Sequence, residues 1–213
     1  DIDEPKSFDL YYFVELNEAH KANLENQIRT TYSGKNAHVV KADCNDKLKD
    51  MASFLKENKR YRALVFIDPY GMSVHWHSIE ALKGLGIDLW ILVPTGVGVN
   101  RLLKNNGLIS EKWISKLEVF LGLSKEEIFE QFYKVQTLNT LFGKEESIEK
   151  EKQAIFKIGE IYTKRLKEIF RFVSQSFIMR NSNNSILYHF MMATNNPNAL
   201  KIANEVISPK YLL

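Results

Sequence analysis

The chain is poor in the residues that build crosslinked or metal-centred folds. Cys44 is the single cysteine among 213 residues, which excludes an internal disulfide and any zinc or iron–sulfur site built from several cysteines of this chain. No apolar run approaches the roughly 20 residues that span a bilayer, and no signal-peptide pattern is present at the amino terminus. We therefore expect a cytoplasmic protein from a reducing compartment, with no membrane partner.

The composition is that of a folded protein. Hydrophobic residues make up 45% and charged residues 26% of the chain, so disorder is not expected. A net charge of +3 permits a polyanionic partner such as nucleic acid but does not require one. The opening residues, 1–6, do not include Met and resemble a loop in mid-protein, so we expect the native protein to have further residues upstream.

Strands and helices alternate in the first half of the chain. Apolar strands are expected at residues 10–16, 38–42, 63–67 and 87–93, with amphipathic helices between them at 18–32, 47–56 and 75–85. This alternation is typical of βαβ units and predicts an α/β fold with a mostly parallel sheet.

The second half has a different pattern. From about residue 110 to 173 we expect only amphipathic helices, at 111–121, 125–134 and 146–172. Two apolar runs, 174–179 and 186–193, flank an Asn/Ser-rich link and predict an antiparallel hairpin, and a last helix is expected at 197–206. We divide the chain into a core at 1–109, a helical insertion at 110–173, and a hairpin and helix at 174–213 that complete the core.

Acidic residues lie at or just after the ends of three of the predicted strands. Ligands of open α/β sheets bind at the carboxyl ends of the strands. A carboxylate at Glu15 could accept hydrogen bonds from both hydroxyls of a ribose, or be an ordinary surface acid. Asp43 could bind an adenine amino group with Cys44 beside it, or it could cap the following helix. Both interpretations remain open for each residue.

The third strand ends in Asp68-Pro69-Tyr70-Gly71. Pro69 restricts the backbone of Asp68 to an extended conformation, so the carboxylate is directed. Gly71 allows a sharp turn or a close approach to a ligand. Asp68 and the Pro69 carbonyl could accept hydrogen bonds from an exocyclic amine while Tyr70 stacks on a flat ring, as in enzymes that act on an extruded base. The alternative is a solvated acid followed by a turn.

Two further segments contain residue types that are found in binding sites. The segment 95–101 contains Gly-x-Gly but lacks the third glycine of a phosphate cradle. We expect a flexible loop on the substrate side, in which Asn100 or Arg101 contacts a polar or anionic ligand. His75 and His77 flank Trp76, but no third ligand is evident, so we assign no metal.

Several of these segments together resemble the three-Cys-motif partner proteins. The resemblance spans about residues 10–206 and is carried by 65–71 (Val-Phe-Ile-Asp-Pro-Tyr-Gly), Trp76 with Ile79 and Leu82, 88–94, 98–101 and 188–197. It implies a Rossmann-like domain of the S-adenosylmethionine-dependent methyltransferase type, with a mostly parallel sheet, a C-terminal antiparallel hairpin and a helical insertion. It also implies a partner protein that contains three clustered cysteines.

One departure from that family concerns the cofactor. The family's acidic, Gly-rich loop for the methionine part of S-adenosylmethionine is missing from this sequence. The strand that carries the loop would be central, between the strands that end at Glu15 and Asp68. We expect upstream residues to supply it, because neighbours of a missing central strand would expose unpaired backbone groups.

The resemblance implies a methyltransferase whose acceptor is unknown and could be an amino group of a nucleic-acid base. Glu15, Asp43, Cys44 and Asp68 would bind the cofactor, Asp68, Pro69 and Tyr70 would be catalytic, and Tyr70, Gly71, Asn100 and Arg101 would bind the acceptor. The alternative function is a non-catalytic module that binds the three-cysteine protein. A nuclease that uses Asp43 and Asp68 on Mg²⁺ is less favoured, since no acidic cluster is evident.

Overall fold

The computed structural model describes residues 7–140 and 143–208, so the predicted loop at residues 1–6 and the end of the segment 174–213 lie outside it. The chain divides into two compact units, residues 1–54 and 55–213, and the division falls within helix α2. In the described part of the chain, no helix has both the length and the apolar character needed to cross a membrane.

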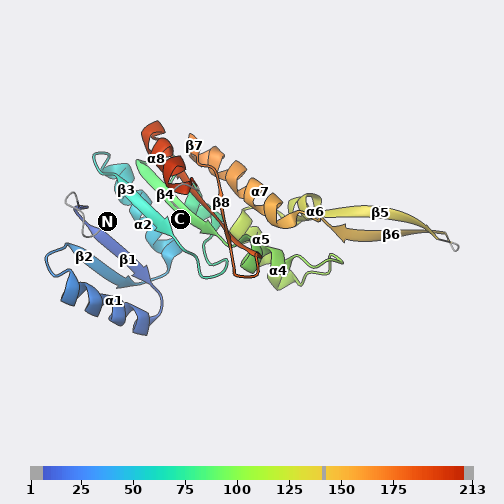
Figure 1. The fold of residues 1–213 in the computed structure, drawn as a ribbon, viewed down its shortest axis with the longest axis horizontal. Coiled ribbons are helices and arrows are strands. Elements are labelled where there is room, and N and C mark those ends of the chain that lie inside the picture. Colours follow the sequence, from blue (N-terminus) through green and yellow to red (C-terminus); the bar gives the residue numbers. More distant parts are fainter. Residues whose placement is uncertain (1–6, 141–142, 209–213) are drawn as a thin grey trace. The chain divides into compact units, whose positions relative to one another are not determined.

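Unit 1 is a small α/β unit (Figure 1). Its elements are β1 (Tyr11–Glu15), α1 (Glu18–Thr31), β2 (Ala37–Lys41) and the start of α2 (Cys44–Glu57). The two strands pair in parallel, with α1 as the crossover. Asn17 begins α1, since its side-chain oxygen accepts hydrogen bonds from the backbone N–H groups of Ala19 and His20, as expected of an N-cap. The predicted strands and helices of this segment are confirmed.

Unit 2 contains a five-stranded mixed sheet. Its strands are β3 (Ala63–Ile67), β4 (Ile87–Val93), β7 (Phe172–Val173), β8 (Phe177–Arg180) and β9 (Ile186–Thr194). The order is β3-β4-β9-β7, with β8 also paired to β9. Only β3 and β4 are parallel among these described strands; β9 runs antiparallel to β4, β7 and β8. The α/β class and the β8–β9 hairpin are confirmed, but this sheet is mixed rather than mostly parallel.

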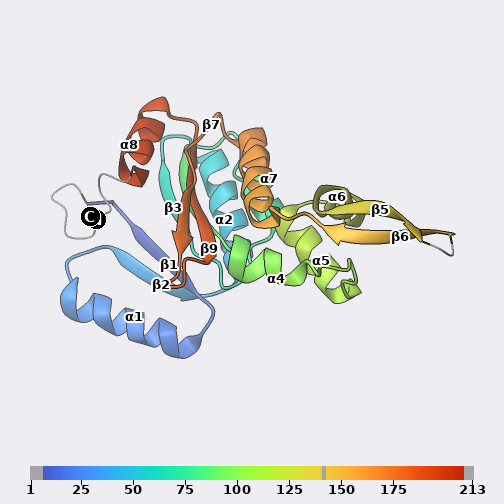
Figure 2. The ribbon, with the colours of Figure 1, turned by 45° about the vertical axis from the view of Figure 1, so that its right-hand side comes forward.

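The core of unit 2 follows from the alternation along β4. Ile87, Leu89, Ile91 and Val93 are buried while the residues between them are partly exposed, because successive side chains of a strand point to opposite faces. Helix α7 (Ala154–Ile169) packs on one face of β9, and α8 (Pro197–Ile207) lies on the opposite side of it (Figure 2). Asn196 caps α8 and Pro197 occupies its first turn, which is a favoured start.

Short helices link the strands of unit 2. They are α3 (Trp76–Glu80), the π-helix η1 (Thr95–Val99), α4 (Asn100–Leu102), α5 (Glu111–Leu121) and α6 (Lys125–Phe132). Helix α5 has the predicted bounds, whereas α3 is shorter than the predicted helix at 75–85. Ser124 and Glu127 form a capping box at the start of α6, in which each side chain accepts the other residue's backbone N–H.

The predicted helical insertion contains a β-hairpin. Strands β5 (Tyr133–Thr140) and β6 (Gly143–Lys150) pair antiparallel along their whole length, and they extend away from α6 and α7 (Figure 1). The helix predicted at 146–172 was therefore wrong in its first turns, and α7 begins at Ala154. Lys and Glu are good helix formers, but cross-strand pairing outweighs such a local preference.

Candidate functional site

Two of the predicted site residues lie at the same edge of unit 1. Strands β1 and β2 are parallel, and Glu15, the last residue of β1, is in register with Lys41, the last residue of β2. Asp43 follows two residues later. The carboxyl ends of the two strands therefore bring Glu15 and Asp43 to one edge, which is the edge where α/β sheets bind ligands.

Glu15 retains a free acceptor at this edge. One carboxylate oxygen, Oε1, accepts a hydrogen bond from the backbone N–H of Asn17 at 2.7 Å. The other, Oε2, lies 4.0 Å from His20 Nδ1, which is beyond hydrogen-bond distance. The Glu15 side chain is 35% exposed, so its second oxygen can accept a hydrogen bond from a ligand.

Asp43 begins helix α2. Its Oδ1 accepts the backbone N–H of Asn45 at 2.7 Å, and its carbonyl accepts the N–H of Lys47, so the helix-capping interpretation is confirmed. A cap uses one carboxylate oxygen and leaves the other available. Cys44 is half-buried beside it, and burial, followed by the charge of Asp43, raises the pKa of its thiol. A thiol in this state is a poor nucleophile, so Cys44 can line a pocket but is not an activated group.

The Asp68-Pro69-Tyr70-Gly71 segment ends β3 in unit 2. Pro69 is buried and Asp68 is exposed, so the proline anchors the turn while the carboxylate faces solvent. Tyr70 is 98% exposed, which leaves both faces of its ring open. Gly71 has φ +63°, a left-handed conformation that glycine adopts at little cost. The turn thus presents an acid and a free aromatic ring.

The predicted acceptor residues after β4 lie on α4. Lys150 donates hydrogen bonds to Asn100 Oδ1 at 2.6 Å and to the carbonyls of Asn100 and Leu103. Burial lowers the pKa of this lysine. The Asn100 amide oxygen thus holds Lys150, the last residue of β6, in place. The Arg101 side chain, in contrast, is exposed. The segment before them is not the flexible loop that we expected: η1 is helical, and Thr95, Gly98 and Val99 are buried.

Sequence reasoning missed a buried polar contact at the end of β4. His189 of β9 lies opposite Val93, and its Nδ1 is 2.8 Å from Thr95 Oγ1. The ring is 3% exposed, and burial, with a smaller effect of Arg180, lowers its pKa. The alternation of residues 186–194 could have indicated that His189 shares the inward face with Met191 and Ala193.

The structure divides the predicted residues between the two units. Glu15, Asp43 and Cys44 belong to unit 1, whereas Asp68, Tyr70, Asn100 and Arg101 belong to unit 2. Within the described residues, no group of three or more His, Cys, Asp or Glu side chains could hold a metal ion.

Comparison with models of protein families, with curated proteins and with solved structures finds no match for this chain. Fold and geometry thus define an α/β protein with acids at its strand ends.

Proposed function

We propose that this chain is an S-adenosylmethionine-dependent methyltransferase. The observation that carries the proposal is the placement of Glu15 and Asp43 at the carboxyl edge of the parallel β1–β2 pair. A nucleoside offers the complementary donors, namely two ribose hydroxyls and an exocyclic amine. In this proposal the free oxygen of Glu15 accepts from the ribose, the second oxygen of Asp43 accepts from adenine, and Cys44 lines the base pocket.

The exposed turn after β3 supports an amine acceptor. The Asp68 carboxylate and the Pro69 carbonyl would accept hydrogen bonds from an amino group, and Tyr70 would stack on a flat ring, such as a nucleic-acid base. Arg101 would contact an anionic part of the acceptor. S-adenosylmethionine would supply the methyl group, and the protein's contribution would be mainly the placement of the acceptor amine.

A continuous Rossmann-like sheet is part of this proposal. In the described residues, β1 and β3 are edge strands of their sheets. Both carry exposed apolar side chains, among them Tyr12 on β1 and Leu64 and Phe66 on β3, which are 48%, 45% and 61% exposed. Open edges of this kind are normally paired or covered. The expected further strand, with its Gly-rich cofactor loop, remains a prediction.

Calorimetry of the full-length protein with S-adenosylmethionine tests the cofactor site. We expect Glu15→Ala to weaken binding about thirtyfold, because losing charge-assisted hydrogen bonds to the ribose costs about 2 kcal/mol. Glu18→Ala is the matched control, since Glu18 is also an exposed acid of unit 1 but pairs with Lys41 at 3.1 Å. If S-adenosylmethionine does not bind, or if both variants bind equally well, the assignment is wrong.

The Asp68→Ala variant distinguishes cofactor binding from methyl transfer. If Asp68 holds the acceptor and not the cofactor, this variant keeps its affinity for S-adenosylmethionine and loses methyl transfer to an adenine- or cytosine-containing oligonucleotide. Equal transfer by the variant and the parent chain would remove Asp68 from the mechanism.

The exposed apolar residues of β3 also favour a second function, a non-catalytic module that binds a three-cysteine-motif protein. Leu64 and Phe66 would be buried in such a complex, and hydrophobic burial of this kind drives association. This second function is supported if the chain forms a stable complex with that partner and does not bind S-adenosylmethionine.

A further inference from the structure

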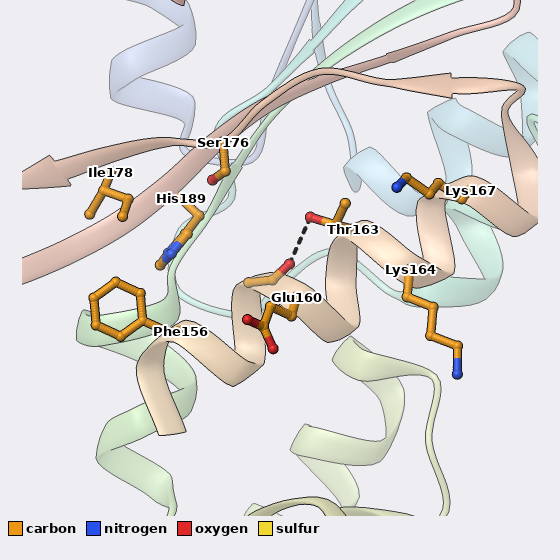
Figure 3. A pocket seen from close by; sticks show the side chains of 9 residues that line it. Phe156, Glu160, Thr163, Lys164, Lys167, Ser176, Ile178 and His189 are labelled. Carbon is orange, nitrogen blue, oxygen red and sulfur yellow. Dashed lines mark hydrogen bonds between the residues drawn. The ribbon is translucent and has the colours of Figure 1, made fainter. Parts of the chain in front are cut away.

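A second candidate site lies within unit 2, between α7 and the β8–β9 hairpin. Its cavity has a volume of about 430 Å³, in the range of small-molecule sites. Figure 3 shows the side chains around it: Phe156, Glu160 and Lys167 project from α7, and Ser176, Ile178 and His189 come from the hairpin side. It contains none of the strand-end acids, so it is independent of the proposed methyltransferase site.

His189 is built into the wall of this cavity. Helix α7 approaches closely because position 159 is glycine: a Cβ there would lie 2.7 Å from His189 Cδ2 and 2.9 Å from Nε2. The ring also lies nearly perpendicular to the ring of Phe156, with 6.2 Å between centroids. The imidazole is therefore held in one orientation by Gly159, Phe156 and Thr95.

The hydrogen bond to Thr95 favours one tautomer of His189. Thr95 is fully buried, and among the described residues its hydroxyl has His189 Nδ1 as its side-chain partner. A buried hydroxyl proton needs an acceptor, which Nδ1 provides only when it is unprotonated. The proton of the neutral ring is then on Nε2. Among the described residues Nε2 has no hydrogen-bond partner, so a donor faces the cavity.

The charges and walls of the cavity indicate the ligand. Two lysines and one glutamate line it, and Lys167 points toward Thr163 and the cavity while Lys164 points away (Figure 3). Phe156 and Ile178 form apolar walls. The hydroxyl of Ser176 is buried without a partner and can turn toward a ligand by a change of rotamer. Two lysines against one glutamate leave a net positive charge at the cavity, which together with the neutral donors suits a monoanion with an apolar body.

We propose that this cavity binds a small organic carboxylate. His189 Nε2–H and the Lys167 ammonium donate hydrogen bonds to the carboxylate, and Phe156 and Ile178 contact the apolar body of the ligand. Charge-assisted hydrogen bonds of this type are the stronger ones in proteins.

Benzoate is a suitable probe, and neutral benzamide of nearly the same shape is its control. In the full chain labelled with ¹⁵N-histidine, the His189 ring signals are assigned as those that disappear in His189→Gln. We expect benzoate to shift the Nε2 signal of His189 in a saturable way and benzamide to leave it in place. An unshifted signal, or an equal response to both probes, would overturn the proposal.

A pair of lysine variants tests the charge. Lys167→Gln should weaken benzoate binding about tenfold, whereas Lys201→Gln, on the exposed side of α8, should not change it. The same affinity in the Lys167→Gln protein would exclude Lys167 as a ligand-binding residue. An equal loss in both variants would show non-specific attraction to the basic chain. Both positions are on the surface, and a thermal melt verifies that each variant is folded.

Discussion

The contact between Gly159 and His189 gives the sharpest prediction for the folded chain. An alanine Cβ at position 159 would overlap the buried ring of His189, which cannot leave without giving up its hydrogen bond to Thr95. Overpacking of this kind costs about 1–3 kcal/mol, and the strain on the buried hydrogen bond places this site at the upper end, at about 3 kcal/mol. Alanine regains about 1 kcal/mol of helix propensity. We expect Gly159→Ala to lower the free energy of unfolding by about 2 kcal/mol.

The effect of Gly159→Ala on stability should change sign when the His189 ring is absent. In a His189→Ala background nothing opposes the new methyl group, so Gly159→Ala should stabilise the chain by about 1 kcal/mol through helix propensity alone. The coupling free energy between the two positions would then be about 3 kcal/mol, at the upper end of what residues in contact show.

Urea unfolding followed by tryptophan fluorescence measures this cycle. All three tryptophans of the chain, at positions 76, 90 and 113, belong to unit 2, so the signal reports on the unit that contains the contact. If Gly159→Ala destabilises both backgrounds to the same extent, the cost does not come from His189 and the packing argument is refuted.

Two further predictions concern the same unit. Because burial lowers the pKa of folded His189 below its ordinary 6.5, the unfolded ring takes up a proton at a higher pH than the folded one. Stability should therefore fall as the pH drops below about 6.5, by up to about 1.4 kcal/mol per pH unit, and urea unfolding of His189→Gln should lack this slope. Gly122 ends α5 at φ +64°, and a Cβ there would overlap Trp76 Cδ1. A left-handed alanine costs about 1–2 kcal/mol before the clash is added, so thermal melts should show a large loss for Gly122→Ala. In contrast, Gly34→Ala, with open space around its Cβ, should be nearly neutral.

The sequence was sufficient for the elements whose signals are local. The run Ile-Asp-Leu-Trp-Ile-Leu-Val predicted β4 with its observed bounds, and the Asn/Ser-rich link predicted the β8–β9 hairpin. The acids at the carboxyl ends of β1 and β2 could be predicted to share an edge, because parallel strands with a helical crossover place their carboxyl ends together. The capping role of Asp43 was also among the alternatives derived from the sequence.

Contacts between distant segments could not be predicted in this way. Local preference also failed for the β5–β6 hairpin, since its residues suit a helix as well and pairing between these neighbouring strands decides their state. The mixed unit 2 sheet likewise depends on β9 joining β4 from nearly a hundred residues away.

The composition and periodicity of this chain determined its α/β class, most of its strands and helices, and the acids at the strand ends, since these depend on residues close in sequence. Only the tertiary structure decided that Gly159 and His189 meet at one cavity and that Thr95 is hydrogen-bonded to the His189 ring. Each is unremarkable in its own segment. Their role arises because the close packing of the interior places the Thr95 hydroxyl and the backbone of Gly159, which has no Cβ, against the His189 imidazole.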